Sequence, residues 1–149
     1  GVWYASGLGA ASHAVLPYEQ RLQRLPAYLQ QLEMESNGKR VDRNGHALPY
    51  GTSPVLWGEP GTNGQHTYFQ ALHQGSGLVP VDFLVAARSD HGLSGHHEML
   101  VANCFAQAQA LMQGKTRAAA YAELRSNGLD DAAACRPLAV LVIRTPEMT

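Results

Sequence analysis

The sequence is poor in charge and in long apolar runs, and each shortage excludes a class of protein. Charged residues make up 15% of the 149 residues, and the formal net charge is -1. A surface dedicated to nucleic acid or to anionic lipid needs clustered Lys and Arg, so this charge balance argues against both partners. No uninterrupted apolar run approaches the roughly 20 residues of a transmembrane helix. We therefore expect no membrane span.

Cysteine is also scarce. Cys104 and Cys135 are the only two, and they stand far apart in the sequence. Isolated cysteines without short spacing fit a reduced, cytoplasmic protein better than a disulfide scaffold. The apolar fraction of 45% is typical of a globular domain, and 149 residues suffice for one core. The chain begins with Gly inside an apolar stretch that lacks a basic region, so we expect a piece of a longer protein rather than a signal peptide.

Hydrophobic patterning predicts strands that alternate with helices. Strands are expected over residues 12–18, 54–57, 78–86 and 137–144, and a short buried apolar segment over residues 2–8. Helices are expected over residues 19–34, 66–73, 96–113 and 116–126. Strands separated by helices predict an α/β fold, here a three-layer αβα sandwich around a mainly parallel sheet.

Three details refine this pattern. Pro26 interrupts the first expected helix, as a kink or as the sign of a late start. Two Asn-Gly pairs flank residues 39–43, which predicts a small hairpin or excursion. In the helix over 96–113, one face carries the apolar positions Leu100, Cys104, Ala108 and Leu111. This face is expected to be the buried one.

The stretch WGEPGTNGQH lies between an expected strand and an expected helix, where open parallel sheets place their functional residues. Gly58, Gly61 and Gly64 would allow tight turns and a close approach of the backbone to a ligand, although a plain glycine-rich connection is an equal alternative. The pattern is neither a phosphate loop nor a dinucleotide fingerprint. His66 ends the stretch, and a helix-start histidine bonded to backbone is its ordinary role.

The stretch LQQLEMESNGK places Glu33 and Glu35 at the end of a helix that Ser-Asn-Gly is expected to terminate. A carboxylate at a helix C-terminus is held there at an electrostatic cost of about 0.3–1 kcal/mol when exposed. A solvated surface acid and a functional carboxylate both remain open on spacing alone.

Other clusters give weaker signals. His91, His96, His97 and Glu98 invite comparison with a zinc site, but the second histidine of a metalloprotease helix is missing and neither cysteine has ligand spacing. Ordinary capping and core contacts are favoured, so no metal site is predicted. No G-x-S-x-G sequence supports a catalytic serine.

Taken together, three long stretches carry a family resemblance: SHAVLPYEQRLQRLPAYLQQLEMESNGK, SPVLWGEPGTNGQHTYFQALHQGSGLVPVDFL and HHEMLVANCFAQAQALMQGKT. They resemble the second sugar-isomerase (SIS) domain of the glucose-6-phosphate isomerase family. The resemblance is close over residues 1–116, whereas residues 117–149 form a divergent C-terminal helix and strand. The whole chain, residues 1–149, is therefore expected to be a single partial SIS domain.

The resemblance implies an aldose–ketose isomerisation of glucose 6-phosphate and fructose 6-phosphate through a cis-enediol. Glu35 would be the base that shuttles the proton between C2 and C1, and Gln31 would contact the substrate. His66 would assist ring opening in the active site of a neighbouring subunit, which implies a homodimer. One carboxylate can perform both proton transfers, so no metal or cofactor is expected.

Parts of the family pattern are missing. A serine and threonine phosphate loop, a Gly-Gly-Arg sequence and a GVELGK sequence have no counterpart among the 149 residues. Glu59 stands in the glycine-rich stretch, but the family pattern assigns the proton transfer to Glu35, so Glu59 is expected to be structural. The isolated chain is expected to be inactive. A non-catalytic sugar-phosphate-binding module or an inert excised domain is the alternative.

Overall fold

The computed structural model describes residues 2–128, so the strand predicted over residues 137–144 lies outside the described part of the chain. The elements are the strands β1 (Ser12–Tyr18), β2 (Val55–Trp57) and β3 (Val81–Val85), the α-helices α1 (Leu25–Leu29), α2 (Gly61–Thr67), α3 (Phe69–Gln74), α4 (His96–Gln113) and α5 (Arg117–Ser126), the π-helices η1 (Trp3–Gly7) and η3 (Gln30–Glu35), and the 3₁₀-helix η2 (Gln20–Leu22). No helix within residues 2–128 combines the length and the apolar character that crossing a membrane needs.

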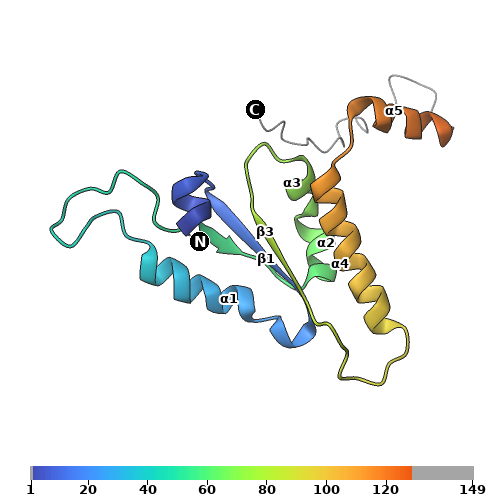
Figure 1. Cartoon of the computed structure of the whole chain (residues 1–149), viewed down its shortest axis with the longest axis horizontal. Coiled ribbons are helices and arrows are strands. Elements are labelled where there is room, and N and C mark those ends of the chain that lie inside the picture. The colour runs from blue at the N-terminus through green and yellow to red at the C-terminus, as the bar shows by residue number, and fades with distance from the viewer. Residues whose placement is uncertain (1, 129–149) are drawn as a thin grey trace.

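The three strands form a parallel sheet in the order β2-β1-β3. Helices α1 and η3 contact one side of this sheet, and α2, α3 and α4 cover the other side (Figure 1). Parallel strands need crossover connections, and the helices that provide them bury both faces of the sheet. The predicted α/β sandwich with a parallel sheet is thereby confirmed, as an incomplete three-layer arrangement.

The core lies between β1 and the helices α3 and α4. Ala14, Leu16 and Tyr18 alternate along β1 and pack with Phe69 of α3 and Cys104 of α4, all of them at most 4% exposed. On α4, the four predicted core positions are buried or half-buried while most of their neighbours are exposed, so the predicted face is confirmed. Contact with β1 and β3 thus determines which face of α4 turns inward.

The first predicted helix begins later and ends later than expected. Only η2 forms after Glu19, and α1 begins at Leu25 with Pro26 in its first turn, where a missing N–H does no harm. The chain then widens into the π-helix η3, and Ser36 and Asn37 stay helical. The predicted termination at Ser-Asn-Gly is confirmed, because the helix closes at Gly38, whose N–H donates to the Met34 carbonyl at 2.9 Å.

The helix predicted over residues 66–73 is confirmed in large part by the end of α2 and by α3, but the prediction of a loop up to that helix was wrong. Helix α2 begins at Gly61, and His66 lies in its last turn, not at a helix start. The two helical glycines serve close packing: a Cβ on Gly61 would lie 2.0 Å from Cε2 of Tyr18, and a Cβ on Gly64 would lie 2.6 Å from the Tyr68 hydroxyl. These two glycines thus allow a close approach of tyrosine side chains from the same domain.

The segment over residues 2–8 was expected to be buried, and this was wrong. It forms η1, in which Ala5 is the buried residue, while Val2 and Trp3 are 66% and 69% exposed. By contrast, the excursion predicted around residues 39–43 is confirmed. It is closed by an antiparallel bridge between Val41 and Ala47 and by Asp42, whose carboxylate accepts the N–H groups of Asn44 and His46.

Candidate functional site

Gln31 and Glu35 both lie on η3 and both are exposed. Because a π-helix closes a turn in slightly more than four residues, positions 31 and 35 still project from about the same side. Lys39 donates from its Nζ to the Glu35 carbonyl at 2.6 Å, which places a cation at the helix C-terminus, where it is favourable. The end of η3 therefore presents an amide and a carboxylate side by side to solvent.

The opposite side of η3 anchors it to the sheet. The Gln30 amide donates to the carbonyl of Leu56 at 2.9 Å, and the Leu56 N–H donates to the Met34 sulfur at 3.3 Å. Leu56 lies on β2, whose free edge these two side chains occupy. Gln31 and Glu35 are thus carried by a helix that is fixed to an edge strand through hydrogen bonds as well as through packing.

His66 lies on a different face of the domain. It is exposed in the last turn of α2, which packs on β1 and α4. Helix η3, which carries Glu35, packs on β2 from the other side of the sheet (Figure 1). The structure thus brings Gln31 and Glu35 together and keeps His66 apart from them within one chain.

Sequence reasoning did not single out the contacts beneath His66. The Gln65 amide donates to the Tyr18 hydroxyl at 2.9 Å, and the Glu59 N–H donates to the Tyr68 hydroxyl at 3.0 Å. The sequence held one indication of these contacts, the neighbouring polar residues Gln65 and His66. Neighbouring residues on a helix point in different directions, so one of the two can bond to the core while the other faces solvent.

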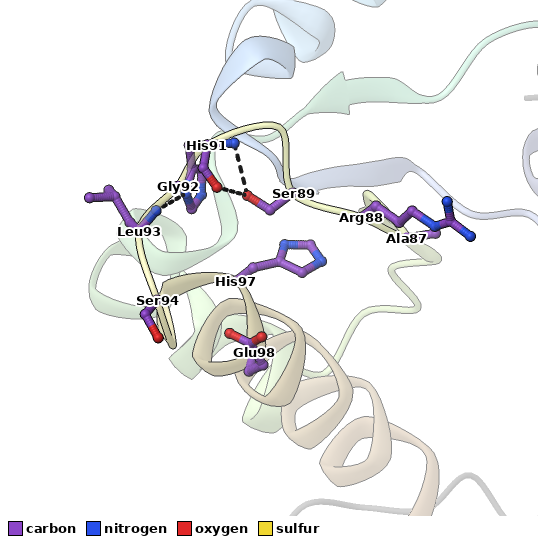
Figure 2. A pocket seen from close by; sticks show the side chains of 9 residues that line it. All are labelled: Ala87, Arg88, Ser89, His91, Gly92, Leu93, Ser94, His97 and Glu98. Atoms are coloured by element: carbon purple, nitrogen blue, oxygen red, sulfur yellow. Dashed lines mark hydrogen bonds between the residues drawn. The ribbon is translucent and has the colours of Figure 1, made fainter.

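The loop between β3 and α4 borders a shallow, open pocket of about 410 Å³ (Figure 2). His91 shapes this loop: its N–H donates to the Ser89 hydroxyl, and its Nδ1 accepts the Leu93 N–H at 3.3 Å. His97 and Glu98 line the pocket from the first turn of α4. The bonds of His91 are ordinary loop contacts of the kind predicted for this cluster, but Gly95 precedes α4 with no side-chain cap, so the predicted helix capping is absent there. None of Gln31, Glu35 and His66 lines this pocket.

An ion-pair network ties the same loop to the end of β1. Arg21 donates from Nε to Glu19 at 2.9 Å and from Nη1 to Asp90 at 2.5 Å. The hydrogen bonds from the Arg21 side chain and backbone lower the pKa of Glu19 to about 2. Since a carboxylate that accepts several hydrogen bonds resists protonation, this contact persists well into the acid range.

A parallel sheet between two helical layers defines an incomplete three-layer α/β domain, and a solved glucose-6-phosphate isomerase has a similar fold. The family model for phosphoglucose isomerase matches residues 1–140. The chain belongs to the phosphoglucose isomerase family.

Curated relatives and solved structures agree with this assignment. The glucose-6-phosphate isomerase of Chlorobium phaeobacteroides is 60% identical over 132 residues, which are 89% of this chain and 24% of that protein. The enzyme of the same name from Polaromonas naphthalenivorans is 60% identical over 126 residues, 85% of this chain and 24% of that protein. The chain thus spans about a quarter of the length of these relatives.

Among solved structures, a glucose-6-phosphate isomerase from Chlamydia trachomatis superposes with a TM-score of 0.69 at 45% identity, covering 78% of this chain and 24% of that one. The hypothetical protein TT0462 from Thermus thermophilus superposes with a TM-score of 0.53 at 25% identity, over 68% of this chain and 27% of that one. The domain described here therefore recurs as one part of larger folds.

Proposed function

We propose that this chain is a partial SIS domain that supplies part of the active site of a glucose-6-phosphate isomerase, which interconverts glucose 6-phosphate and fructose 6-phosphate. The observation that carries the proposal is the exposed pair Gln31 and Glu35 at the end of η3, in a chain 60% identical to enzymes of that name. Gln31 holds a substrate hydroxyl, and Glu35 stands beside it as the proton carrier.

The chemistry needs one base close to two neighbouring carbons. The Glu35 carboxylate removes the proton from C2 of the open-chain aldose, which leaves a cis-enediolate with its negative charge on O1. The hydroxyl proton on O2 moves to O1, and Glu35 then returns its proton to C1 to give the ketose. Proton transfer by a positioned carboxylate accelerates such a step by about 10²–10⁴-fold. Electrons and protons balance within the substrate and this one group.

Ring opening precedes the proton transfer and needs a separate group near the ring oxygen. An imidazole that titrates close to neutral pH suits this role, and His66 is the exposed imidazole of α2. Because α2 and η3 pack on opposite sides of the sheet, one chain does not present His66 and Glu35 to the same sugar. We therefore place His66 in the site of a second copy, in a cytoplasmic homodimer of the complete enzyme.

The complete site requires groups that lie outside this chain, so the experiment uses a host enzyme. The host enzyme is the Chlorobium phaeobacteroides relative with its matching quarter replaced by the sequence of this chain, whose residue numbers we keep. We expect the host enzyme to isomerise glucose 6-phosphate, and Glu35→Gln to lower kcat by about 1,000-fold with KM changed little. The readout is product formation coupled to a dehydrogenase.

Glu33→Gln is the matched control, because Glu33 lies on the same helix two residues away. We expect it to retain activity within a few-fold. A host enzyme that is folded and dimeric but binds fructose 6-phosphate without turnover would instead support the non-catalytic alternative. Wild-type turnover in Glu35→Gln would remove Glu35 from the mechanism.

A further inference from the structure

Helix α2 has little stability of its own. It contains seven residues, and Gly61 and Gly64 are two of them. Isolated helices shorter than about 12 residues are marginal in water, and the interior glycine Gly64 weakens this one by about 1 kcal/mol relative to alanine. The orientation of α2, and of the exposed His66 that it carries, must therefore be fixed by contacts with the rest of the domain.

The principal contact comes from Tyr18, at the end of the central strand β1. The Tyr18 side chain is 1% exposed, and its ring lies directly against Gly61. One turn further along α2, the Gln65 amide donates to the Tyr18 hydroxyl at 2.9 Å. Gly61 and Gln65 share one face of α2 because they are four residues apart. Tyr18 thus contacts that face along its length.

A second tyrosine holds the start of α2. The Tyr68 hydroxyl accepts the Glu59 N–H at 3.0 Å and lies against Gly64, while the Tyr68 ring meets Trp57 edge-on at 4.7 Å between centroids. Burial raises the pKa of Tyr68 to about 12. This hydroxyl therefore stays protonated across the physiological range. It closes the turn from β2 into α2 and packs against Gly64, whereas the hydrogen bond to a side chain of α2 comes from Tyr18.

We propose that Tyr18 and Gln65 are positioning residues that orient the His66 side chain. The hydrogen bond between them fixes the rotation of α2 about its axis. His66 follows Gln65 directly, so it projects about 100° further around the helix, toward solvent. A rotation of α2 that breaks the Gln65 bond displaces the imidazole by an ångström or more. Displacements near 1 Å cost about 10²-fold when a group must meet a reacting atom.

This inference rests on the proposed function of His66 in ring opening, and it predicts a specific kinetic defect. If the orientation of the His66 side chain is lost, ring opening slows while the rate of proton transfer by Glu35 is unchanged. Ring opening then limits turnover, and the rate becomes insensitive to the mass of the hydrogen on C2. A variant that merely contains less folded enzyme has a lower rate but an unchanged isotope effect.

The experiment compares glucose 6-phosphate with its C2-deuterated form in the host enzyme. For Tyr18→Phe, which deletes the hydroxyl and keeps the ring, we expect kcat/KM to fall about 10-fold and the deuterium isotope effect to fall toward one. A loss of rate with the wild-type isotope effect, or no loss of rate, would overturn the inference. Tyr28→Phe is the control, since the Tyr28 side chain is 59% exposed on α1.

Gln65→Met removes the other partner of the same bond with little change in volume, and it serves if Tyr18→Phe folds poorly. We expect it to show the same loss of isotope effect, whereas Gln70→Met, on the exposed side of α3, should change neither quantity. The double variant Tyr18→Phe/Gln65→Met should be no slower than the slower single variant, because both act through one bond. Additive losses in the double variant would contradict the proposal.

Failure of this inference is distinguishable from failure of the proposed function. If Glu35→Gln retains the wild-type rate, the proposed mechanism fails whatever Tyr18→Phe does. If Glu35→Gln and His66→Ala are both inactive but Tyr18→Phe keeps the wild-type isotope effect, only the positioning role is wrong. As a direct check on the 149-residue chain, Tyr18→Phe should shift the NMR signals of the Gln65 amide and the His66 ring and leave the Gln70 amide in place.

Discussion

At the scale of single residues, the contact between Gly61 and Tyr18 shows why a glycine occupies a helix. The ring of Tyr18 takes the space in which any larger residue would place its Cβ. Tyr18 is itself buried at the end of β1 and has no room to withdraw. The glycine is thus a packing requirement, and its conformational freedom is incidental.

Gly61→Ala should therefore destabilise the domain by about 1–3 kcal/mol, the usual range for overpacking. Gly77→Ala is the matched control, because no atom lies within 4 Å of a Cβ placed there, and it should change the free energy of unfolding by less than about 0.5 kcal/mol. Urea denaturation of the two variants measures the difference. Equal stabilities would show that Tyr18 moves aside freely.

The Glu19 carboxylate gives a residue-scale prediction in pH. Its pKa is lowered from the usual 4.5 to about 2 by hydrogen bonds from Arg21, so its stabilising contribution is complete above pH 4.5 and is lost as the pH falls toward 2. Glu19→Gln should remove this contribution, and its stability should decline less steeply on acidification. Urea unfolding of both proteins at about pH 6 and pH 3 measures the two slopes. Parallel declines would refute the assignment.

At the scale of elements, η3 protects the free edge of β2. Strand β2 pairs with β1 on one side, and the peptide groups of Leu56 on its other side bond to the side chains of Gln30 and Met34. An unpaired strand edge is a site for unwanted pairing with other chains. The helix that carries the candidate catalytic pair thus also completes the sheet.

Gln30→Ala should lower the free energy of unfolding by about 1–3 kcal/mol, because it leaves the half-buried Leu56 carbonyl without its partner. Gln23→Ala is the control: its amide oxygen accepts a bond from Gln20 at the surface, where water replaces the loss. Chemical denaturation compares them. If the two substitutions cost the same, the Gln30 bond does not secure the edge of β2.

The elements also show where sequence reasoning succeeds and where it stops. The strand over residues 12–18 and the helix over 96–113 were predicted with their observed bounds, because long apolar periodicity reports burial directly. The start of helix α2 was missed, because Gly61 and Gly64 are chosen by their contacts with Tyr18 and Tyr68, which belong to distant or folded-back segments. Val2, Trp3 and Leu8 are apolar but exposed, so in the segment over residues 2–8 apolar character did not indicate burial in this chain's own core.

The candidate site was predicted from family resemblance and only partly from physical pattern. The four-residue spacing of Gln31 and Glu35 indicated a shared side of a helix, and this spacing survives the change from an α-helix to a π-helix. The separation of His66 across the sheet depends on how β2 and α2 follow one another in space. No local signal encodes that separation.

At the scale of the whole molecule, that separation makes a prediction about subunits. Two host-enzyme variants, Glu35→Gln and His66→Ala, should each be inactive as homodimers. If each site takes Glu35 from one copy and His66 from the other, a mixed dimer contains one intact site, and a random 1:1 mixture of subunits should recover about a quarter of the wild-type rate. Refolding the two variants together measures this recovery. If a verified mixed dimer recovers no activity, each site takes Glu35 and His66 from the same chain.

The most direct measurement of the central claim follows hydrogen at C2. Glucose 6-phosphate is incubated in D₂O with the wild-type host enzyme and with Glu35→Gln, and deuterium on C2 is followed by NMR. The Glu35 account predicts that the wild-type enzyme incorporates deuterium, because the carboxylate exchanges its proton with solvent during some turnovers, and that Glu35→Gln incorporates none above background while binding the sugar phosphate. Deuterium incorporation by Glu35→Gln at the wild-type rate would show that another group carries the proton.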